Sequence, residues 1–281
     1  MIDNKTKAIQ FTYDCIPCAM GSLITLFKKG IVPEDKQEFI FRRMLKYFSE
    51  LNFDQTPPEI GQQMHKLIKE ISENSDPYAD IKNKFNRLML DPEADDPFKF
   101  ALRLAIAGNV IDFGPNNKFD IEKTINKAKS VQLAMDDSEK LREAISRAKQ
   151  ILYLGDNAGE IVMDRIFLET INFPNIIFAV RGGPIINDVT EADAKAVGMD
   201  KIAKIINNGD DAPGTILKNT SDEFKNIFEN ADLIISKGQG NYESLAGCKK
   251  NIYFILMAKC EHVASHLGCK NGDFLVKKNP I

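Results

Sequence analysis

The stretch Leu152-Tyr-Leu-Gly-Asp156-Asn157-Ala-Gly-Glu160 decides how this chain folds. An apolar run ends at a glycine, a carboxylate and an amide side chain follow at once, and a second glycine leads into an amphipathic segment. This order is typical of a buried strand that turns into a helix. Another acid, Asp188, comes shortly after a second apolar run at 176–180. If both runs are strands of one sheet, these polar residues meet at the edge where the strands end.

The second half of the chain repeats this alternation of short β-branched runs with amphipathic stretches. Strands are predicted at 151–154, 176–180, 204–206, 233–235 and 252–257. Parallel neighbours need long connections, and a right-handed helical crossover is strongly favoured. The pattern therefore predicts an α/β fold for residues 148–281, a Rossmann-like three-layer α/β/α domain with a mainly parallel sheet.

The first half has helical periodicity, and we expect an all-helical domain over residues 1–147. One apolar face recurs within 60–71, after the start signal Thr56-Pro-Pro, and another within 98–105, after Asp95-Asp96-Pro97. Further helices are predicted near 17–29, 34–49, 78–90, 119–129 and 138–149. A chain of 281 residues, 43% apolar and 27% charged, is long enough for two modest domains.

Composition argues against several classes of partner. The net charge is −3 and no basic run occurs, so neither nucleic acid nor an anionic membrane is expected, and a small metabolite is favoured. No apolar run reaches the roughly 18 residues of a membrane span, and the first residues do not read as a signal peptide. Five cysteines, an odd number, suggest mostly reduced thiols, so we expect a cytoplasmic protein. The oligomeric state is not indicated.

Oxygen-bearing side chains at the predicted strand ends suggest a metal site. Asp156, Asn157 and Asp188 offer two carboxylates and an amide, a hard and incompletely filled ligand set suited to Mg²⁺ or Mn²⁺. Lys237 lies in a glycine-rich turn after a predicted strand, where an ammonium group can reach a phosphate. Together these features favour phosphoryl chemistry.

Each of these residues also has a plainer interpretation. Asp156 and Asn157 are good helix caps, and Asp188 with Glu191 fits a capping box. Lys237 on its own is more often a solvated surface lysine. The convergence of all four on one edge of a sheet favours the functional interpretation.

Three longer motifs resemble the damage-control phosphatases, the family long catalogued as domain of unknown function 89. They are Gly155-Asp-Asn-Ala-Gly-Glu160, Arg181-Gly-Gly-Pro-Ile-Ile-Asn-Asp188-Val-Thr190 and Ala231-Asp-Leu-Ile-Ile-Ser-Lys-Gly-Gln-Gly-Asn-Tyr-Glu-Ser-Leu245. The helical half resembles the family too, in Cys15-Ile-Pro-Cys18, Thr56-Pro-Pro, Asp76-Pro-Tyr and Ala107-Gly-Asn109-Val-Ile-Asp112. The cysteine pair is similar to the family's microbial subgroup.

The resemblance implies a phosphatase that depends on a divalent cation and acts on small phosphorylated metabolites, such as sugar phosphates or damaged metabolites. It places the metal ligands on Asp156, Asn157 and Asp188, with Mn²⁺ or Mg²⁺ as the ion and Co²⁺ or Ni²⁺ as further candidates. Water activated by the metal would attack the phosphate. The expected catalytic residues are Asp156, Asn157, Asp188, Lys237 and Asp112.

Further residues are candidates for substrate binding and for the general base. We expect the substrate to be bound by Asn109, Glu160, Arg181, Gly238 and Asn241. Candidate bases are Asp112, Glu160 and Asp193, and the sequence does not choose among them.

The cysteines leave three interpretations open. Cys15 and Cys18 could be a thiol redox pair, half of a metal site, or two small buried side chains at a helix start. Cys260 could complete a second metal or redox site if the C-terminal helix packs against the N-terminus. No second C-x-x-C is present.

Two functions from other classes remain as alternatives. A methyltransferase that uses S-adenosylmethionine would share the Rossmann-like sheet, but G-x-G-x-x-G is missing after the first predicted strand. A metal- or redox-sensing protein without enzymatic activity would depend on the cysteines instead. A phosphatase of the haloacid dehalogenase type is disfavoured, because its Asp-x-Asp start is missing: Ala158 holds the second position.

Overall fold

The structure of the protein is a computed structural model, which describes residues 10–28, 30, 32–72, 96–108 and 132–280. Its central feature is a seven-stranded sheet in the order β1-β7-β6-β5-β2-β3-β4. The strands are β1 (Leu133–Asp136), β2 (Ile151–Leu154), β3 (Ile176–Val180), β4 (Lys204–Asn207), β5 (Leu233–Lys237), β6 (Ile252–Met257) and β7 (Phe274–Lys278). The β6–β7 pair is antiparallel and the other neighbours are parallel.

The strand order creates a switch point at the centre of the sheet. From β2 the chain builds outward through β3 to β4, and then returns to place β5 and β6 on the other side of β2. The connections that follow β2 and β5 run in opposite directions along the sheet, so the loops after these two neighbouring strands diverge. In such sheets ligands bind where the loops diverge. We call the edge where strands β2 to β6 end the carboxyl edge.

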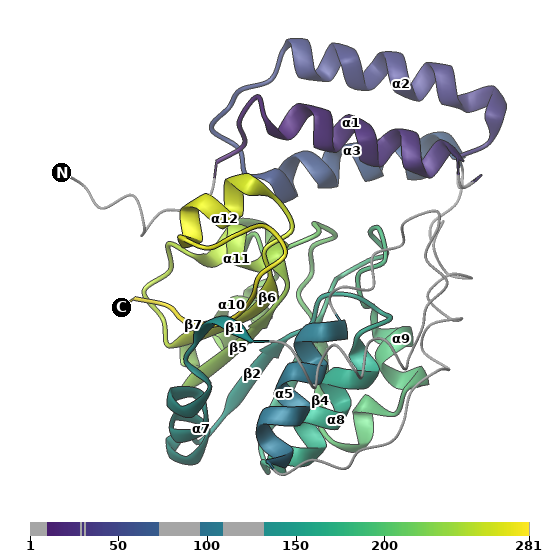
Figure 1. Cartoon of the computed structure of the whole chain (residues 1–281). Coiled ribbons are helices and arrows are strands. Elements are labelled where there is room, and N and C mark those ends of the chain that lie inside the picture. The colour runs from purple at the N-terminus through teal and green to yellow at the C-terminus, as the bar shows by residue number, and fades with distance from the viewer. Residues whose placement is uncertain (1–9, 29, 31, 73–95, 109–131, 281) are drawn as a thin grey trace.

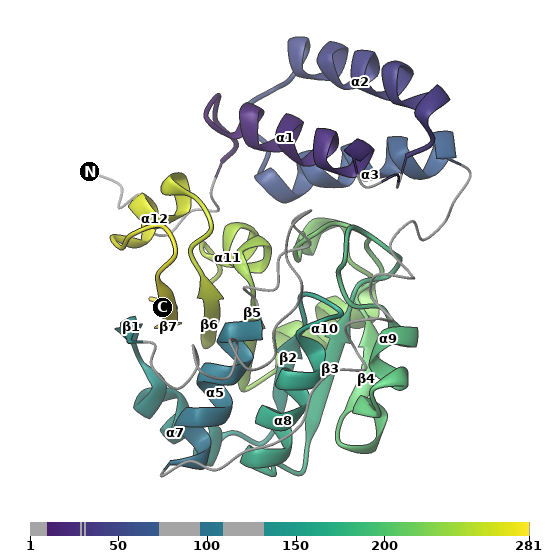
Figure 2. The ribbon, with the colours of Figure 1, turned by 45° about the vertical axis from the view of Figure 1, so that its right-hand side comes forward.

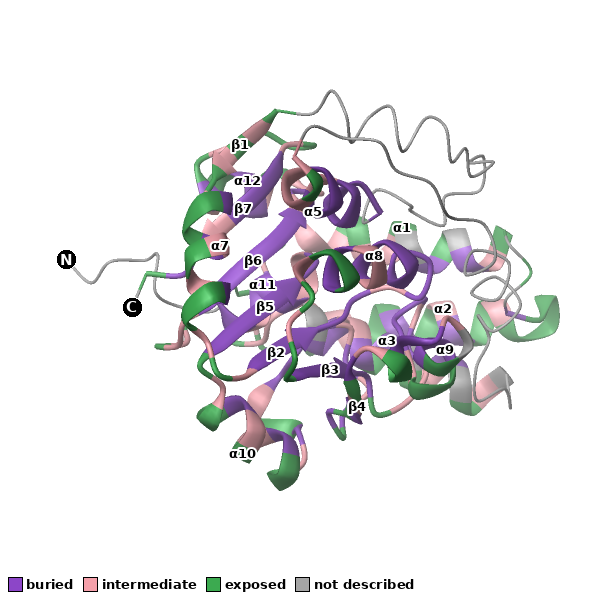
Figure 3. Ribbon diagram, turned by 90° about the horizontal axis from the view of Figure 1, so that it is seen from below, coloured by how far each residue is buried: buried purple, intermediate pink, exposed green. Residues whose placement is uncertain are grey.

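Helices cover both faces of the sheet (Figure 3). One face packs against α5 (Pro97–Gly108), α7 (Ser138–Arg147) and α8 (Ile161–Ile171), and the other against α10 (Asp222–Asn230), α11 (Gln239–Leu245) and α12 (Glu261–Leu267). The short helices α9 (Glu191–Ala196), η2 (Met199–Lys201) and η3 (Leu217–Asn219) lie in the connections. Strands β2, β3 and β5 are buried throughout, as expected for a sheet covered on both sides.

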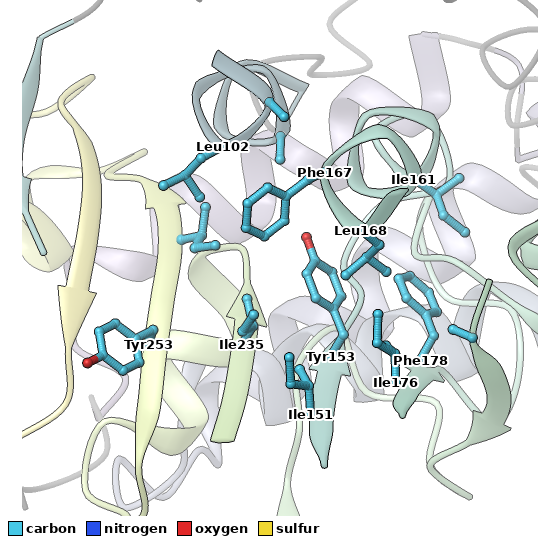
Figure 4. Packing of buried hydrophobic residues seen from close by; sticks show 14 of the residues in the cluster. Leu102, Ile151, Tyr153, Ile161, Phe167, Leu168, Ile176, Phe178, Ile235 and Tyr253 are labelled. Carbon is cyan, nitrogen blue, oxygen red and sulfur yellow. The ribbon is translucent and has the colours of Figure 1, made fainter. Parts of the chain in front are cut away.

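Large side chains fill the space between the sheet and α8 (Figure 4). The rings of Tyr153 and Phe178 stack with centroids 5.3 Å apart, and Phe167 of α8 packs above them. All three side chains are fully buried. This core fixes the central strands and therefore the loops that follow them.

Three further helices form a separate layer above the carboxyl edge (Figures 1 and 2). They are α1 (Cys15–Lys28), α2 (Glu34–Ser49) and α3 (Pro57–Ser72), and they share a small core built around Leu23, Ile40, Met44, Met64 and Ile68. We call these three helices the cap. Its nearest helix to the sheet is α3, which contacts α11.

The prediction that residues 1–147 are all helical is wrong at one element. Strand β1 belongs to the sheet through β7, and both of these strands were missed. The β1 sequence Leu-Ala-Met-Asp is only half buried and has no β-branched residue, so the pattern gave no strand signal. Helices α5 and α7 also pack on the sheet. The α/β and cap layers themselves confirm the predicted fold class; the division at residue 148 stays a prediction.

Most of the predicted helices are present with small changes at their ends. Those near 17–29, 34–49 and 138–149 are observed as α1, α2 and α7. The helices predicted at 78–90 and 119–129 lie outside the described residues. In the described part of the chain, no helix combines the length and the apolar character that a membrane span requires.

Candidate active site

Two acids from neighbouring loops meet around one buried arginine at the carboxyl edge. Arg181 Nε donates to Asp188 Oδ2 at 2.7 Å, and Arg181 Nη2 lies 3.6 Å from Asp156 Oδ1. All three side chains are buried. Asp156 follows β2, and Arg181 and Asp188 follow β3, so adjacent strand ends bring them together.

Backbone hydrogen bonds join the two loops. Asn157 and Asp188 form an antiparallel bridge, and the N–H of Val189 donates to the carbonyl of Asp156 at 2.8 Å. The Asn157 side-chain Nδ2 donates to Asp156 Oδ2 at 2.9 Å. The three predicted metal ligands are therefore neighbours, and the amide oxygen of Asn157 takes no part in that bond.

Gly238 lets the β5 loop approach Asp156 closely. Its φ is +81°, and a Cβ at this position would lie 2.0 Å from Asp156 Oδ2. Only glycine combines a left-handed backbone with this approach. The glycine-rich turn after β5 therefore forms one wall of the site.

Burial and charge act against each other at Asp188. Burial raises the pKa of the Asp188 carboxyl, Arg181 lowers it, and the nearby Asp156 raises it again, with a net value of about 7. One guanidinium group thus faces two desolvated carboxylates. A divalent cation would compensate the remaining negative charge.

The donor set fits a hard cation with open coordination positions. Two carboxylates and an amide oxygen match the ligands of Mg²⁺ or Mn²⁺. In the described part of the chain no cluster of three His, Cys, Asp or Glu side chains could hold a metal, so here the third protein ligand would have to be the Asn157 amide. Arg181 Nη2 is buried without a hydrogen-bond partner, and a phosphoryl oxygen at this position would satisfy it.

Asn241 holds the walls of the site together. Its Oδ1 accepts from Arg181 Nη1 at 3.2 Å and from Thr215 Oγ1 at 2.8 Å. Its Nδ2 donates to the carbonyls of Lys237 at 2.8 Å and Gly155 at 3.3 Å. We expected a substrate contact here, and in this structure the described bonds of Asn241 go to the loops that carry the acids.

Lys237 and Glu160 are fully buried and form an ion pair. Lys237 Nζ donates to Asp164 Oδ1 at 2.6 Å and lies 3.4 Å from Glu160 Oε1, which accepts the backbone N–H of Asn157. Burial would lower the pKa of Lys237, but Asp164, Glu160 and Asp156 raise it, so the ammonium stays charged. Glu160 thus holds the backbone of Asn157, and Lys237 lies beside Glu160. The predicted phosphate and substrate contacts of these two residues stay predictions.

The helix-cap interpretations of the acids are wrong. Helix α8 begins after Glu160 with no side-chain cap bond, so neither Asp156 nor Asn157 caps it. The capping box of α9 is made by Thr190 and Asp193 rather than by Asp188 and Glu191. Asp156 and Asp188 therefore do not serve as caps of these helices, whereas Asp193, a candidate base, is engaged in the capping box as the third residue of α9.

Some expected residues do not join this site. Asn109 and Asp112 lie outside the described residues. Cys15, at the start of α1, is partly buried and Cys18 is exposed, while Cys260 Sγ accepts from Gln239 Nε2 at 3.6 Å. Among the described residues these three cysteines form no metal cluster, and the second metal or redox site stays a prediction.

Several polar residues near the site were not among the predicted site residues, although the loop at 207–215 follows a predicted strand and was expected at this edge. Glu243 of α11 is buried, which raises its pKa to about 7. Lys259, after β6, acts electrostatically on both Asp188 and Glu243. Asp210 and Thr215 come from the β4 loop, and Gln62 comes from the cap. The signal available was weak: polar residues between glycines in 207–215, directly after a predicted strand.

Comparisons with known proteins point to one family. Residues 11–275 match the family described as "Damage-control phosphatase ARMT1-like domain". Damage-control phosphatases of Pyrococcus horikoshii and Archaeoglobus fulgidus are 33% and 35% identical, covering 95% and 94% of this chain and 97% of each relative. A Methanocaldococcus jannaschii protein named only as uncharacterised is 37% identical over 97% of this chain and 96% of its own length.

A solved structure supports the same assignment. The crystal structure of a DUF89 family protein from Pyrococcus horikoshii matches with a TM-score of 0.85 and 32% identity, covering 97% of this chain and 100% of that one. The similarity extends over the cap and the sheet together, and the three motifs at the carboxyl edge fall inside the matched residues. The chain belongs to the damage-control phosphatase family, the DUF89 proteins.

Proposed function

We propose that this protein hydrolyses phosphate monoesters of small metabolites with a divalent cation held by Asp156, Asn157 and Asp188. One observation carries the proposal: two buried carboxylates from adjacent strand ends share a single arginine. The Nη2 of this arginine is buried and has no hydrogen-bond partner. Names of relatives in the same family support phosphatase activity. The cation would be Mn²⁺ or Mg²⁺, with Co²⁺ and Ni²⁺ as further candidates, and the expected cytoplasmic location stays a prediction.

Residues of the chain perform the binding and orientation. Arg181 Nη2 would donate to an oxygen of the transferred phosphoryl group, while its Nε keeps Asp188 in place. Gly238 lets the β5 loop approach the site without a side chain. When bound, the cation supplies charge neutralisation of the phosphate and activation of water. A general base is not assigned.

The proposal is tested by hydrolysis of para-nitrophenyl phosphate. We expect turnover with Mn²⁺ that EDTA abolishes and added Mn²⁺ restores. Asp156→Ala should lower kcat/KM by at least about 100-fold, because the ligand set loses a carboxylate. Asp222→Ala, an equal charge change on the exposed surface, is the control and should stay within about twofold. Turnover that ignores EDTA would contradict the proposal.

Cys15→Ser separates the phosphatase from a sensor that depends on the cysteines. A phosphatase keeps its activity in this variant, because Cys15 is not part of the described site. Loss of activity equal to that of Asp156→Ala would argue for a role of the cysteine pair.

The route of attack is tested by stereochemistry at phosphorus. Direct attack of water forms one P–O bond as the ester P–O bond breaks, and inverts the configuration of a chiral phosphate ester. A covalent aspartyl phosphate requires two displacements and retains it. We expect inversion.

A further inference from the structure

The motif Cys15-Ile-Pro-Cys18 begins a helix of the cap and takes no part in the candidate active site. Helix α1 starts at Cys15, and Cys18 follows three residues later in its first turn. Side chains three residues apart lie on the same face of a helix, with their Cβ atoms about 5–6 Å apart. A disulfide needs a Cβ–Cβ distance of about 3.5–4.5 Å. A small change in this one turn would therefore bring the two sulfur atoms into bonding distance.

The first turn of α1 can make that change at little cost in hydrogen bonds. The first N–H groups of a helix have no partner within the helix. The N–H of Cys15 donates to the Thr12 carbonyl at 3.0 Å, and the N–H of Ile16 donates to the Tyr13 carbonyl at 3.1 Å. Pro17 has no N–H. A disulfide across this turn thus leaves the hydrogen bonds of the following turns in place.

The two thiols differ in how easily a reactant reaches them. Of the five cysteines, all of which lie in the described part of the chain, Cys18 alone is exposed. Cys15 is partly buried, and its Sγ lies 3.6 Å from Thr12 Oγ1, a hydroxyl group that can donate to a thiolate. An external reactant would therefore meet Cys18 first, with Cys15 next to it.

The segment before the motif is held between the cap and the sheet domain. The N–H of Phe11 donates to the carbonyl of Gln55, between α2 and α3, at 2.7 Å. His262 Nε2 of α12 donates to the carbonyl of Gln10 at 3.2 Å, and this segment lies beside α12 in Figures 1 and 2. Anchoring on both sides keeps the first turn of α1 in place, and two reactive groups that are held together react faster with each other.

We propose that Cys15 and Cys18 are a reversible thiol–disulfide pair that exchanges with a small disulfide such as glutathione disulfide. The Cys18 thiolate attacks one sulfur of glutathione disulfide, forms a mixed disulfide and releases one glutathione thiolate. The Cys15 thiolate then attacks the Cys18 sulfur, forms the protein disulfide and releases the second glutathione thiolate. Two cysteines together lose two electrons to one glutathione disulfide, and their two protons pass to the glutathione thiolates.

The test counts thiols and needs no substrate. The full chain is first reduced, then equilibrated in buffers with rising ratios of glutathione disulfide to glutathione, quenched with acid and alkylated with iodoacetamide. Intact-protein mass spectrometry should find five alkyl groups on the reduced chain and three on the oxidised chain, because two of the five thiols are then joined. Peptide mapping should place the new bond between Cys15 and Cys18.

Single variants test the order of the two steps. Cys15→Ser should stop at a mixed disulfide with one glutathione on Cys18, because no second thiol displaces it. Cys18→Ser should take up glutathione at least about 10-fold more slowly, because the remaining thiol of the pair is partly buried. Cys248→Ser is the matched control, since Cys248 is also partly buried but packs against the sheet core. It should be half oxidised within about twofold of the wild-type glutathione ratio.

Three results would overturn the inference. The first is a count of five alkyl groups at every glutathione ratio, and the second is a disulfide that maps to another pair, such as one with Cys260. The third is one equivalent of Zn²⁺ that protects both thiols from alkylation until a chelator is added, which would make the motif part of a metal site. None of these measurements involves a phosphate ester, so the proposed phosphatase function and this inference can fail independently.

Discussion

Gly238 is the residue at which a single added carbon meets a predicted metal ligand. We expect Gly238→Ala to reduce phosphatase activity at least about 100-fold, because the new Cβ would displace the Asp156 carboxylate 2.0 Å away. The positive φ adds a backbone cost of about 1–2 kcal/mol. Activity and the free energy of unfolding are both measured.

Gly268→Ala provides the matched comparison for that variant. Gly268 ends α12 with a φ of +75° and has nothing within 4 Å of the added carbon. It should therefore show the backbone cost without the loss of activity. Equal activity losses in both variants would contradict a steric effect on Asp156.

Glu243 gives the protein a stability that depends on pH. Burial raises its pKa from the ordinary 4.5 to about 7, with a further rise from Asp156 that Gln239 and Lys259 oppose. Because the folded state holds the proton more tightly than the unfolded state, this contribution is full below pH 4.5 and is lost as the pH rises through 7. Protein without divalent cation should become less stable over this window.

Glu243→Gln removes that penalty while keeping an acceptor for Gln239, which donates to Glu243 Oε1 at 2.9 Å. The variant should be more stable than the wild type by roughly 2–3 kcal/mol at pH 8, and by much less at pH 5. Denaturant unfolding in EDTA measures the difference. Glu223→Gln, on the exposed side of α10, should show no such dependence on pH. A difference that stays constant from pH 5 to 8 would contradict this origin.

At the scale of elements, one buried ion pair fastens β5 to α8. Lys237 of β5 donates to Asp164 of α8, which also accepts from the Tyr153 hydroxyl of β2 at 2.7 Å. Burial raises the pKa of Asp164 and Lys237 lowers it. Removing the lysine leaves an uncompensated buried acid, so Lys237→Met should cost about 3–5 kcal/mol of stability.

A second substitution tests this explanation. Lys237→Met combined with Asp164→Asn removes both charges and keeps an acceptor for Tyr153, so it should recover at least about half of the loss. Lys250→Met breaks a surface pair with Glu229 and should cost no more than about 1 kcal/mol. A double variant that is no more stable than Lys237→Met would show that the ammonium acts through other contacts.

For the whole molecule, a bound cation should raise thermal stability. Mn²⁺ at 100 times its Kd would add about 2.7 kcal/mol, because only the folded chain brings the acids of the β2 and β3 loops together. Differential scanning calorimetry measures the shift, which needs no substrate. Asp156→Ala should abolish it and Asp222→Ala should keep it. A shift of equal size in both variants would show that the cation binds outside this site.

The sequence predicted the strands correctly where a local pattern of apolar and polar residues marks them. Strands β2, β3 and β6 lie at the predicted residues, because each is a short apolar run between polar loops. Asp156, Asn157 and Asp188 met as expected, because parallel strands end at one edge. Strand β1 was missed because its sequence is short and half exposed.

What the sequence alone determined is the layered α/β fold and the edge at which its polar loops gather, since periodicity and strand direction follow from neighbouring residues. Only the tertiary structure decided that Lys237 is buried against Asp164, and that Gln62 meets Asp210, 148 residues away. These contacts depend on how helices pack across the sheet and on which glycines admit close approach. The pattern of residues within a single segment does not indicate such contacts between distant segments.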